Sequence, residues 1–136
     1  MSVIALVTAD TLHIVESIEQ MTGVCGLDIT AGQLIRPHAT TGHWALSDAN
    51  NSADVDNTYM ATRTAKSGTA LTGLKRGTVD GFDVSALNYG VNVFLSDTAG
   101  ALDTAAGSNS KIIGQVVPAF SQRLGSSPDK IVRVDL

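Results

Sequence analysis

Cysteine, aromatic residues and charged residues are all scarce in this 136-residue chain. The single cysteine, Cys25, excludes an intrachain disulfide and a zinc site built on a cysteine pair. Aromatic residues make up 4% and charged residues 16%, whereas charged residues reach about 25% in a typical soluble domain. The core must therefore be built from Ala, Val, Leu and Ile. The surface must rely on Thr, Ser, Asn and Gly, or be partly covered by a partner.

Clustered basic charge is also missing. The chain has nine basic and thirteen acidic residues, a net charge of −4, and no basic run longer than Lys75-Arg76. Binding to nucleic acid needs several clustered cations, so this balance argues against a nucleic-acid-binding module. The apolar runs are too short to span a bilayer, and the N-terminus lacks the pattern of a signal peptide. We therefore expect synthesis in a cytosol without export by that route.

Short apolar runs separated by turn residues favour strands over helices. The length suits one domain of about 100–200 residues. The sequence predicts an all-β fold, a small β-barrel or a jelly-roll-like β-sandwich built from hairpins. The expected strands are 3–7, 33–37, 43–46, 69–74, 77–82, 92–95, 112–117 and 131–134.

The N-terminal segment has two interpretations. Apolar residues recur at every third position from Leu12 to Met21, which suits a short helix. The continuous run His13-Ile14-Val15 suits an extended arm instead, because it is rich in β-branched side chains. We therefore expect an extended or short-helical arm over residues 1–19, followed by a single β domain over residues 20–136.

Two segments of the chain repeat one pattern. Segments 32–44 and 90–102 each place a glycine before an apolar strand, then a polar turn, then a second glycine ten residues after the first. Trp44 and Leu102 occupy equivalent places after the turn. Each segment predicts a β-hairpin in which a glycine supplies a turn position with positive φ.

Candidate metal sites are weak. His38 and His43 flank the turn at Gly42, but a two-histidine site needs a further ligand, and Asp48 is the nearest carboxylate. The polar segment 48–56 has oxygen side chains at alternate positions, as calcium loops do, but it lacks the required glycine and the bidentate glutamate. Turn histidines and a solvated loop are the favoured interpretation.

The candidate catalytic motifs also lack residues that their chemistry requires. Segment 68–75 resembles a phosphate-binding loop, but Lys75 comes one residue late and no helix follows. Cys25 has no neighbouring base in the sequence to lower its pKa. Nothing in the sequence gives Glu16 and Glu19 different surroundings, as an acid/base pair requires, so a solvated face is favoured. We therefore predict no enzyme activity, no catalytic residue, no cofactor and no metal.

An ordered set of motifs resembles one known family. Gln20-Met21-Thr22-Gly23 is followed by Ile29-Thr30-Ala31-Gly32-Gln33-Leu34-Ile35 and then by Thr40-Thr41-Gly42-His43-Trp44. The second half adds Asp80-Gly81-Phe82, Ser96-Asp97-Thr98-Ala99-Gly100, Gly114-Gln115-Val116-Val117-Pro118 and Val132-Arg133-Val134-Asp135-Leu136. In this order, over residues 20–136, the motifs resemble the head-decoration, or capsid-cement, proteins of tailed bacteriophages.

The resemblance implies a non-enzymatic virion protein on the outer surface of an icosahedral capsid. Such a protein would be made in the host cytoplasm and would bridge neighbouring subunits of the major capsid protein. Some proteins of this kind act as dimers and others as trimers, so self-association is also expected. No direct nucleic-acid or membrane contact is implied.

Few large side chains are available as contacts. Trp44 is also a candidate for the domain's own core, and if residues 1–10 reach a neighbour, their deletion should weaken shell binding more than it lowers the melting temperature. The alternative function is a small β-barrel that carries a ligand in a pocket closed by the loop 48–57. The candidate capsid or oligomer contacts are Val3, Ile4, Leu6, Trp44, Tyr59 and Phe120.

Overall fold

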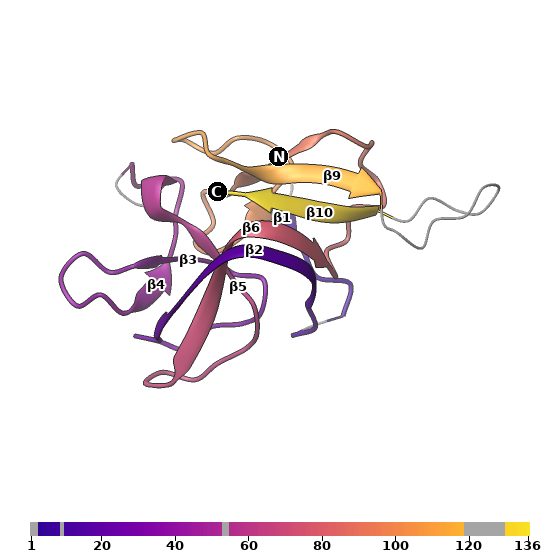
Figure 1. The fold of residues 1–136 in the computed structure, drawn as a ribbon. Helices are drawn as coiled ribbons and strands as arrows, with labels where there is room; N and C mark the ends of the chain where they lie inside the picture. Colours follow the sequence, from indigo (N-terminus) through magenta and orange to yellow (C-terminus); the bar gives the residue numbers. More distant parts are fainter. Residues whose placement is uncertain (1–2, 9, 53–54, 119–129) are drawn as a thin grey trace.

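The chain folds into ten antiparallel strands that form one strongly curled half-barrel sheet (Figure 1). The structure is a computed structural model and describes residues 3–8, 10–52, 55–118 and 130–136. These residues include no α-helix and one 3-10 turn, η1 (Val55–Asn57). The all-β prediction is confirmed. No helix in the described part of the chain is long and apolar enough to cross a membrane.

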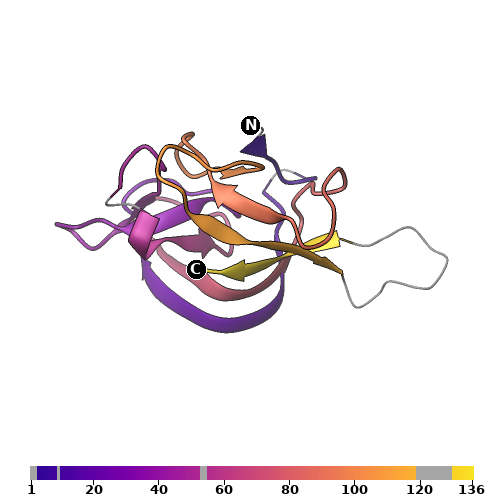
Figure 2. The same ribbon diagram turned by 90° about the horizontal axis from the view of Figure 1, so that it is seen from above.

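Strand β6 (Ala70–Asp80) is the centre of the sheet, because it pairs with three other strands. Strand β2 (His13–Val24) runs along one edge of β6 for its whole length. On the other edge, β10 pairs with residues 76–79 and β5 pairs with residues 73–74. Figure 2 shows β2 and β6 curving together around the interior, with β2 outermost. The remaining strands are β1 (Val3–Ile4), β3 (Leu34–Pro37), β4 (Trp44–Leu46), β5 (Tyr59–Ala61), β7 (Asn92–Leu95), β8 (Leu102–Asp103), β9 (Ile112–Pro118) and β10 (Lys130–Asp135).

Two hydrophobic cores share a wall formed by β3 and β5. Leu34 and Met60 pack into the larger core, while the next residue of each strand, Ile35 and Ala61, packs into the smaller core. All four side chains are fully buried. Since successive residues of a strand point to opposite faces, both faces of this wall are covered. The larger core also contains Ile4, Ala49, Leu74, Val79, Phe82, Val84, Val93, Leu95, Leu102, Ile113, Val116, Val132 and Val134, and the smaller one contains Cys25, Ile29, Trp44, Ala65 and Leu71.

The segment 11–21 is extended, so the short-helix alternative is wrong and the extended alternative is right. The recurrence of apolar residues at every third position from Leu12 to Met21 results from the way β2 pairs with β6. Its register shifts between Ile14 and Glu16 and between Ser17 and Glu19, which leaves Val15 and Ile18 as extra residues in β2. A third shift, between Glu19 and Gln20, leaves Lys75 as an extra residue in β6. Such bulges add one residue to one strand and change which side chains share a face.

Other strand predictions were partly right. Strands 69–74 and 77–82 are one continuous strand, β6, and β5 and β8 were not predicted. Strand β5 is only three residues long and β8 only two. Strands this short contain too few residues to show an alternating pattern.

The repeated pattern corresponds to two hairpins whose equivalent glycines have similar φ angles. Gly32 and Gly90 have φ values of 83° and 81°, and Gly42 and Gly100 have φ values of 73° and 76°. The registers also match, because Pro37 pairs with Trp44 in one hairpin and Leu95 pairs with Leu102 in the other. The predicted hairpins and their positive-φ glycines are confirmed.

The N-terminal segment closes one end of the curl. Strand β1 pairs with β8, and Leu6 bridges Phe82 just beyond β6. Val7 donates a backbone hydrogen bond to the Gly81 carbonyl over 2.7 Å, and Asp83 donates one to the Ala5 carbonyl over 2.8 Å. These contacts join the segment that follows β1, the strand at one end of the sheet order, to the end of the central strand β6.

Candidate functional site

A row of polar side chains crosses the outer, convex face of the sheet. Glu16 of β2 pairs with Thr78 of β6, and Thr78 pairs with Arg133 of β10. Arg133 donates a 3.1 Å hydrogen bond to Gln115 of β9, and Gln115 donates a 3.2 Å hydrogen bond to Asn92 of β7. Because cross-strand neighbours on one face interact directly, this row presents one continuous polar surface.

A second row lies two β6 residues away and alternates in charge. Asp135 of β10 and Glu19 of β2 both pair with Arg76 of β6. The Arg76 Nε atom lies 3.4 Å from the Asp135 Oδ1 atom, and both side chains are more than half exposed. The row therefore reads negative, positive, negative from β10 to the edge of the sheet.

The outer edge of β2 is accessible. Within the described parts of the chain, residues 13–23 of β2 pair on one edge only, and the other edge meets β4 first at Cys25. Val15, Ile18 and Val24 are exposed by 42%, 66% and 41%. Alternate residues of an edge strand direct their N–H and C=O groups away from the sheet, which leaves main-chain groups free for pairing. Sequence reasoning found the exposed glutamates of this strand but missed its accessible edge.

A shallow hollow of about 200 Å³ lies between the edge of β2 and the two rows of polar and charged side chains described above. Ile18 supplies its largest apolar side chain, and charged groups of both signs surround it. The hollow is lined by Glu16, Ile18, Arg76, Gly77, Thr78, Arg133, Val134 and Asp135.

The contacts predicted near the N-terminus differ in exposure. Val3 is 51% exposed and Ile4 is 6% exposed, as expected for neighbours on opposite faces of a strand. Leu6 is partly buried against the larger core. Strand β2 runs from residue 13 to residue 24 without a break. The boundary expected between the arm (residues 1–19) and the β domain (residues 20–136) therefore falls inside this strand.

Trp44 lies inside the smaller core, where its ring is 1% exposed. Its Nε1 atom donates a 2.8 Å hydrogen bond to the Leu71 carbonyl of β6. A Cβ atom added at Gly23 would lie 3.0 Å from that Nε1 atom, so glycine leaves room for the ring. This burial agrees with the expectation of a core role for Trp44. Phe120, another predicted contact, lies outside the described residues.

Tyr59 connects the small core to the surface. Its ring lies edge-on to Trp44 at a centroid distance of 5.2 Å, and Lys75 Nζ lies 4.7 Å from its ring centroid. Its hydroxyl lies 3.9 Å from the Met21 Sδ atom of β2. The side chain is half-buried, and its polar end reaches the accessible strand.

Two of the three histidines, His38 and His43, flank a turn. His38 and His43 face each other across the β3–β4 hairpin, where the His38 amide donates to the His43 carbonyl over 2.8 Å. The His38 Nδ1 atom accepts hydrogen bonds from the amides of Thr40 and Thr41 over 3.2 and 3.4 Å. No group of three His, Cys, Asp or Glu residues able to hold a metal ion occurs among the described residues.

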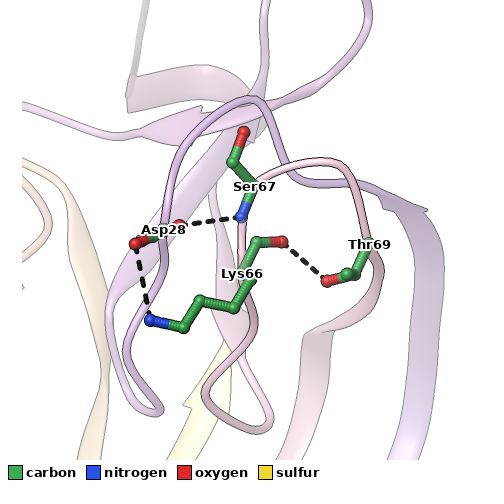
Figure 3. Close-up of polar contacts among 4 residues, drawn as sticks. All are labelled: Asp28, Lys66, Ser67 and Thr69. Atoms are coloured by element: carbon green, nitrogen blue, oxygen red, sulfur yellow. Dashed lines mark hydrogen bonds and ion pairs between the residues drawn. The ribbon is translucent and has the colours of Figure 1, made fainter.

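Cys25 is buried beneath a loop that Asp28 holds in place. The Asp28 carboxylate accepts a 2.8 Å hydrogen bond from the Ser67 amide and lies 3.7 Å from Lys66 Nζ (Figure 3). Thr69 donates a 2.6 Å hydrogen bond to the Lys66 carbonyl and closes the turn. Burial raises the pKa of the Cys25 thiol, which leaves it protonated and a poor nucleophile.

An open groove of about 450 Å³ lies beside the N-terminal segment. Residues from segments 4–6, 30–33 and 98–102 form its walls, together with Asp10 and Phe82. The described residues of loop 48–57 do not line it, so this groove is not the loop-closed pocket considered from the sequence.

Known proteins give no match to this chain. Neither protein-family models nor curated proteins match its sequence, and no solved structure matches its fold.

Proposed function

We propose that the protein is a structural subunit that decorates and cements the outer surface of an icosahedral phage capsid. It bridges neighbouring subunits of the major capsid protein and acts as a dimer or trimer. The ordered motifs over residues 20–136 support this role, and two of their glycines, Gly42 and Gly100, lie at positive φ between the strands of the two hairpins.

One structural observation favours a binding role most. Strand β2 offers a free edge over residues 13–23 with exposed apolar and acidic side chains, beside a broad polar face. An accessible strand edge can add main-chain hydrogen bonds with another chain. Many copies on a lattice make modest affinity at each contact effective through avidity.

Co-sedimentation with shells tests the proposal directly. The purified protein is mixed with emptied, expanded phage heads, with unexpanded procapsids or with buffer alone. Saturable binding to expanded heads is expected, and the plateau copy number reports the lattice position. Absence of binding to every shell contradicts the capsid role.

The groove near the N-terminus supports one alternative, a small ligand-binding or carrier module. Its volume of about 450 Å³ lies within the range of small-molecule sites, which is roughly 300–1,000 Å³. A carrier would show a melting shift with a small molecule. A thermal-shift screen with Ala99→Arg, a change at an exposed residue of the groove wall, as the matched control variant separates this function from the capsid role.

A further inference from the structure

We propose that the outer edge of β2 binds an extended segment of a different protein that carries two basic residues at alternate positions. This inference deepens the proposed function, and it rests on that function for identifying the segment as part of the capsid subunit. The chemistry of the segment follows from the charges and the register of β2.

The charge of the added strand follows from the second row. Asp135, Arg76 and Glu19 alternate in sign up to the edge, so the next position outward is complementary to a cation. In the first row, Glu16 is the charged residue at the edge. Opposite charges on neighbouring strands attract, and like charges directly opposite each other repel.

The spacing of the two cations follows from the register. Glu16 pairs with Thr78 and Glu19 pairs with Arg76, two β6 residues apart on one face. The extra residue Ile18 at the bulge makes the glutamates three apart in β2 but two apart along its partner. A regular added strand therefore places basic residues at positions i and i+2.

A second copy of the chain is a poor occupant. Antiparallel pairing of two β2 strands centred between Ser17 and Ile18 places Glu16 of one copy opposite Glu19 of the other, and pairing about the midpoint of β2 places the glutamates opposite Met21 and Ile18. The strand from His13 to Val24 carries no lysine or arginine to compensate. The three register shifts along β2 also disturb a long regular pairing, a common protection of edge strands against self-association.

Apolar contacts complete the surface. Val15 and Ile18, the bulge residues, are exposed although protected edges usually place charged side chains there. Ile18 lines the hollow between the charged rows, so an apolar side chain of the added strand can be covered there. The predicted segment is thus extended, basic at two alternate positions and apolar between them.

Labelled ten-residue peptides test the inference without a shell. One peptide alternates threonine and valine around two lysines placed at i and i+2, and the other has glutamates in place of the lysines. We expect the lysine peptide to bind about tenfold more tightly, because both cross-strand pairs are attractive with lysine and repulsive with glutamate. The double variant Glu16→Lys/Glu19→Lys should reverse this preference. Equal binding of both peptides, or an unchanged preference in the variant, overturns the inference.

Shell binding tests the apolar part. Val15→Ser/Ile18→Ser should weaken co-sedimentation with expanded heads, and the control Leu27→Ser/Ile112→Ser, with exposed apolar residues elsewhere, should not. Equal binding of all variants overturns the β2 surface while the capsid role stands. If no shell binds but the peptide preference appears, the surface stands and the capsid role fails.

Sedimentation velocity tests the remaining occupant, a second copy of the chain. A dimer that Val15→Ser/Ile18→Ser abolishes would identify a second copy and overturn the inference.

Discussion

Leu34 and Ile35 are consecutive residues of β3, yet their side chains belong to different hydrophobic cores. Leu34 packs with Met60 and Leu74 in the larger core, and Ile35 packs with Trp44 in the smaller one. Both are fully buried, so β3 has no solvent-facing side at this point.

Truncation of either residue should therefore destabilise the protein. We expect Leu34→Ala and Ile35→Ala each to lower the free energy of unfolding by about 2–5 kcal/mol, because each leaves a cavity. Urea unfolding followed by tryptophan fluorescence measures both. The milder Ile35→Val should cost about 0.5–1.5 kcal/mol. A near-neutral result for one of the two alanine variants would place that side chain at the surface.

The paired glycines give a second prediction. A Cβ atom added at Gly42 meets no atom within 4 Å, whereas one at Gly100 lies 3.0 Å from Leu46 Cδ2. Gly42→Ala should cost only the positive-φ strain, about 1–2 kcal/mol. Gly100→Ala should cost more, since a crowded side chain must also move. Gly42→Asn should recover part of the loss, because asparagine tolerates this conformation. Equal costs at the two positions in urea unfolding would contradict this contrast.

The N-terminal residues give a third prediction. Ile4→Ala should destabilise the fold by about 2–5 kcal/mol, because its side chain is part of the larger core. Val3→Ala, at the exposed neighbouring position, should stay within about 0.5 kcal/mol. Thermal unfolding measures both. Equal, small effects would show that the segment is not integrated in the fold. If shell binding falls in Val3→Ala while stability is unchanged, the segment has a separate contact role.

The buried thiol predicts a pH dependence. Burial is the main cause of the raised pKa of Cys25, and the charge of Asp28 adds to it against the opposing charge of Arg63. The unfolded thiol ionises first as pH rises, so the stability of the native state falls above the ordinary thiol pKa. The loss approaches about 1.4 kcal/mol per pH unit until the raised pKa is passed. The Cys25→Ala variant should lack this part of the profile, as urea unfolding across alkaline pH would reveal. Parallel profiles would refute the prediction.

Local sequence patterns predicted the hairpins because their information is local. Positive φ is adopted at four glycines, and a glycine in a turn can be recognised from the local sequence alone. These are Gly32, Gly42, Gly90 and Gly100. Strand β7 (Asn92–Leu95) was predicted with its observed bounds for the same reason.

Long-range pairing was beyond the reach of the sequence. The step of three in β2 has the same appearance as a helical period until its partner β6 is known, because the bulges at Val15 and Ile18 arise only from that pairing. The candidate surface was missed for the same reason. Glu19, Arg76 and Asp135 are far apart in the chain, and only the register of three strands aligns them.

The mixed charge of the convex face has a kinetic consequence. The row Asp135–Arg76–Glu19 carries one net negative charge, and salt screens its field beyond about 8 Å at physiological ionic strength. A basic partner is therefore attracted over a short range only, and its association rate falls as the salt concentration rises.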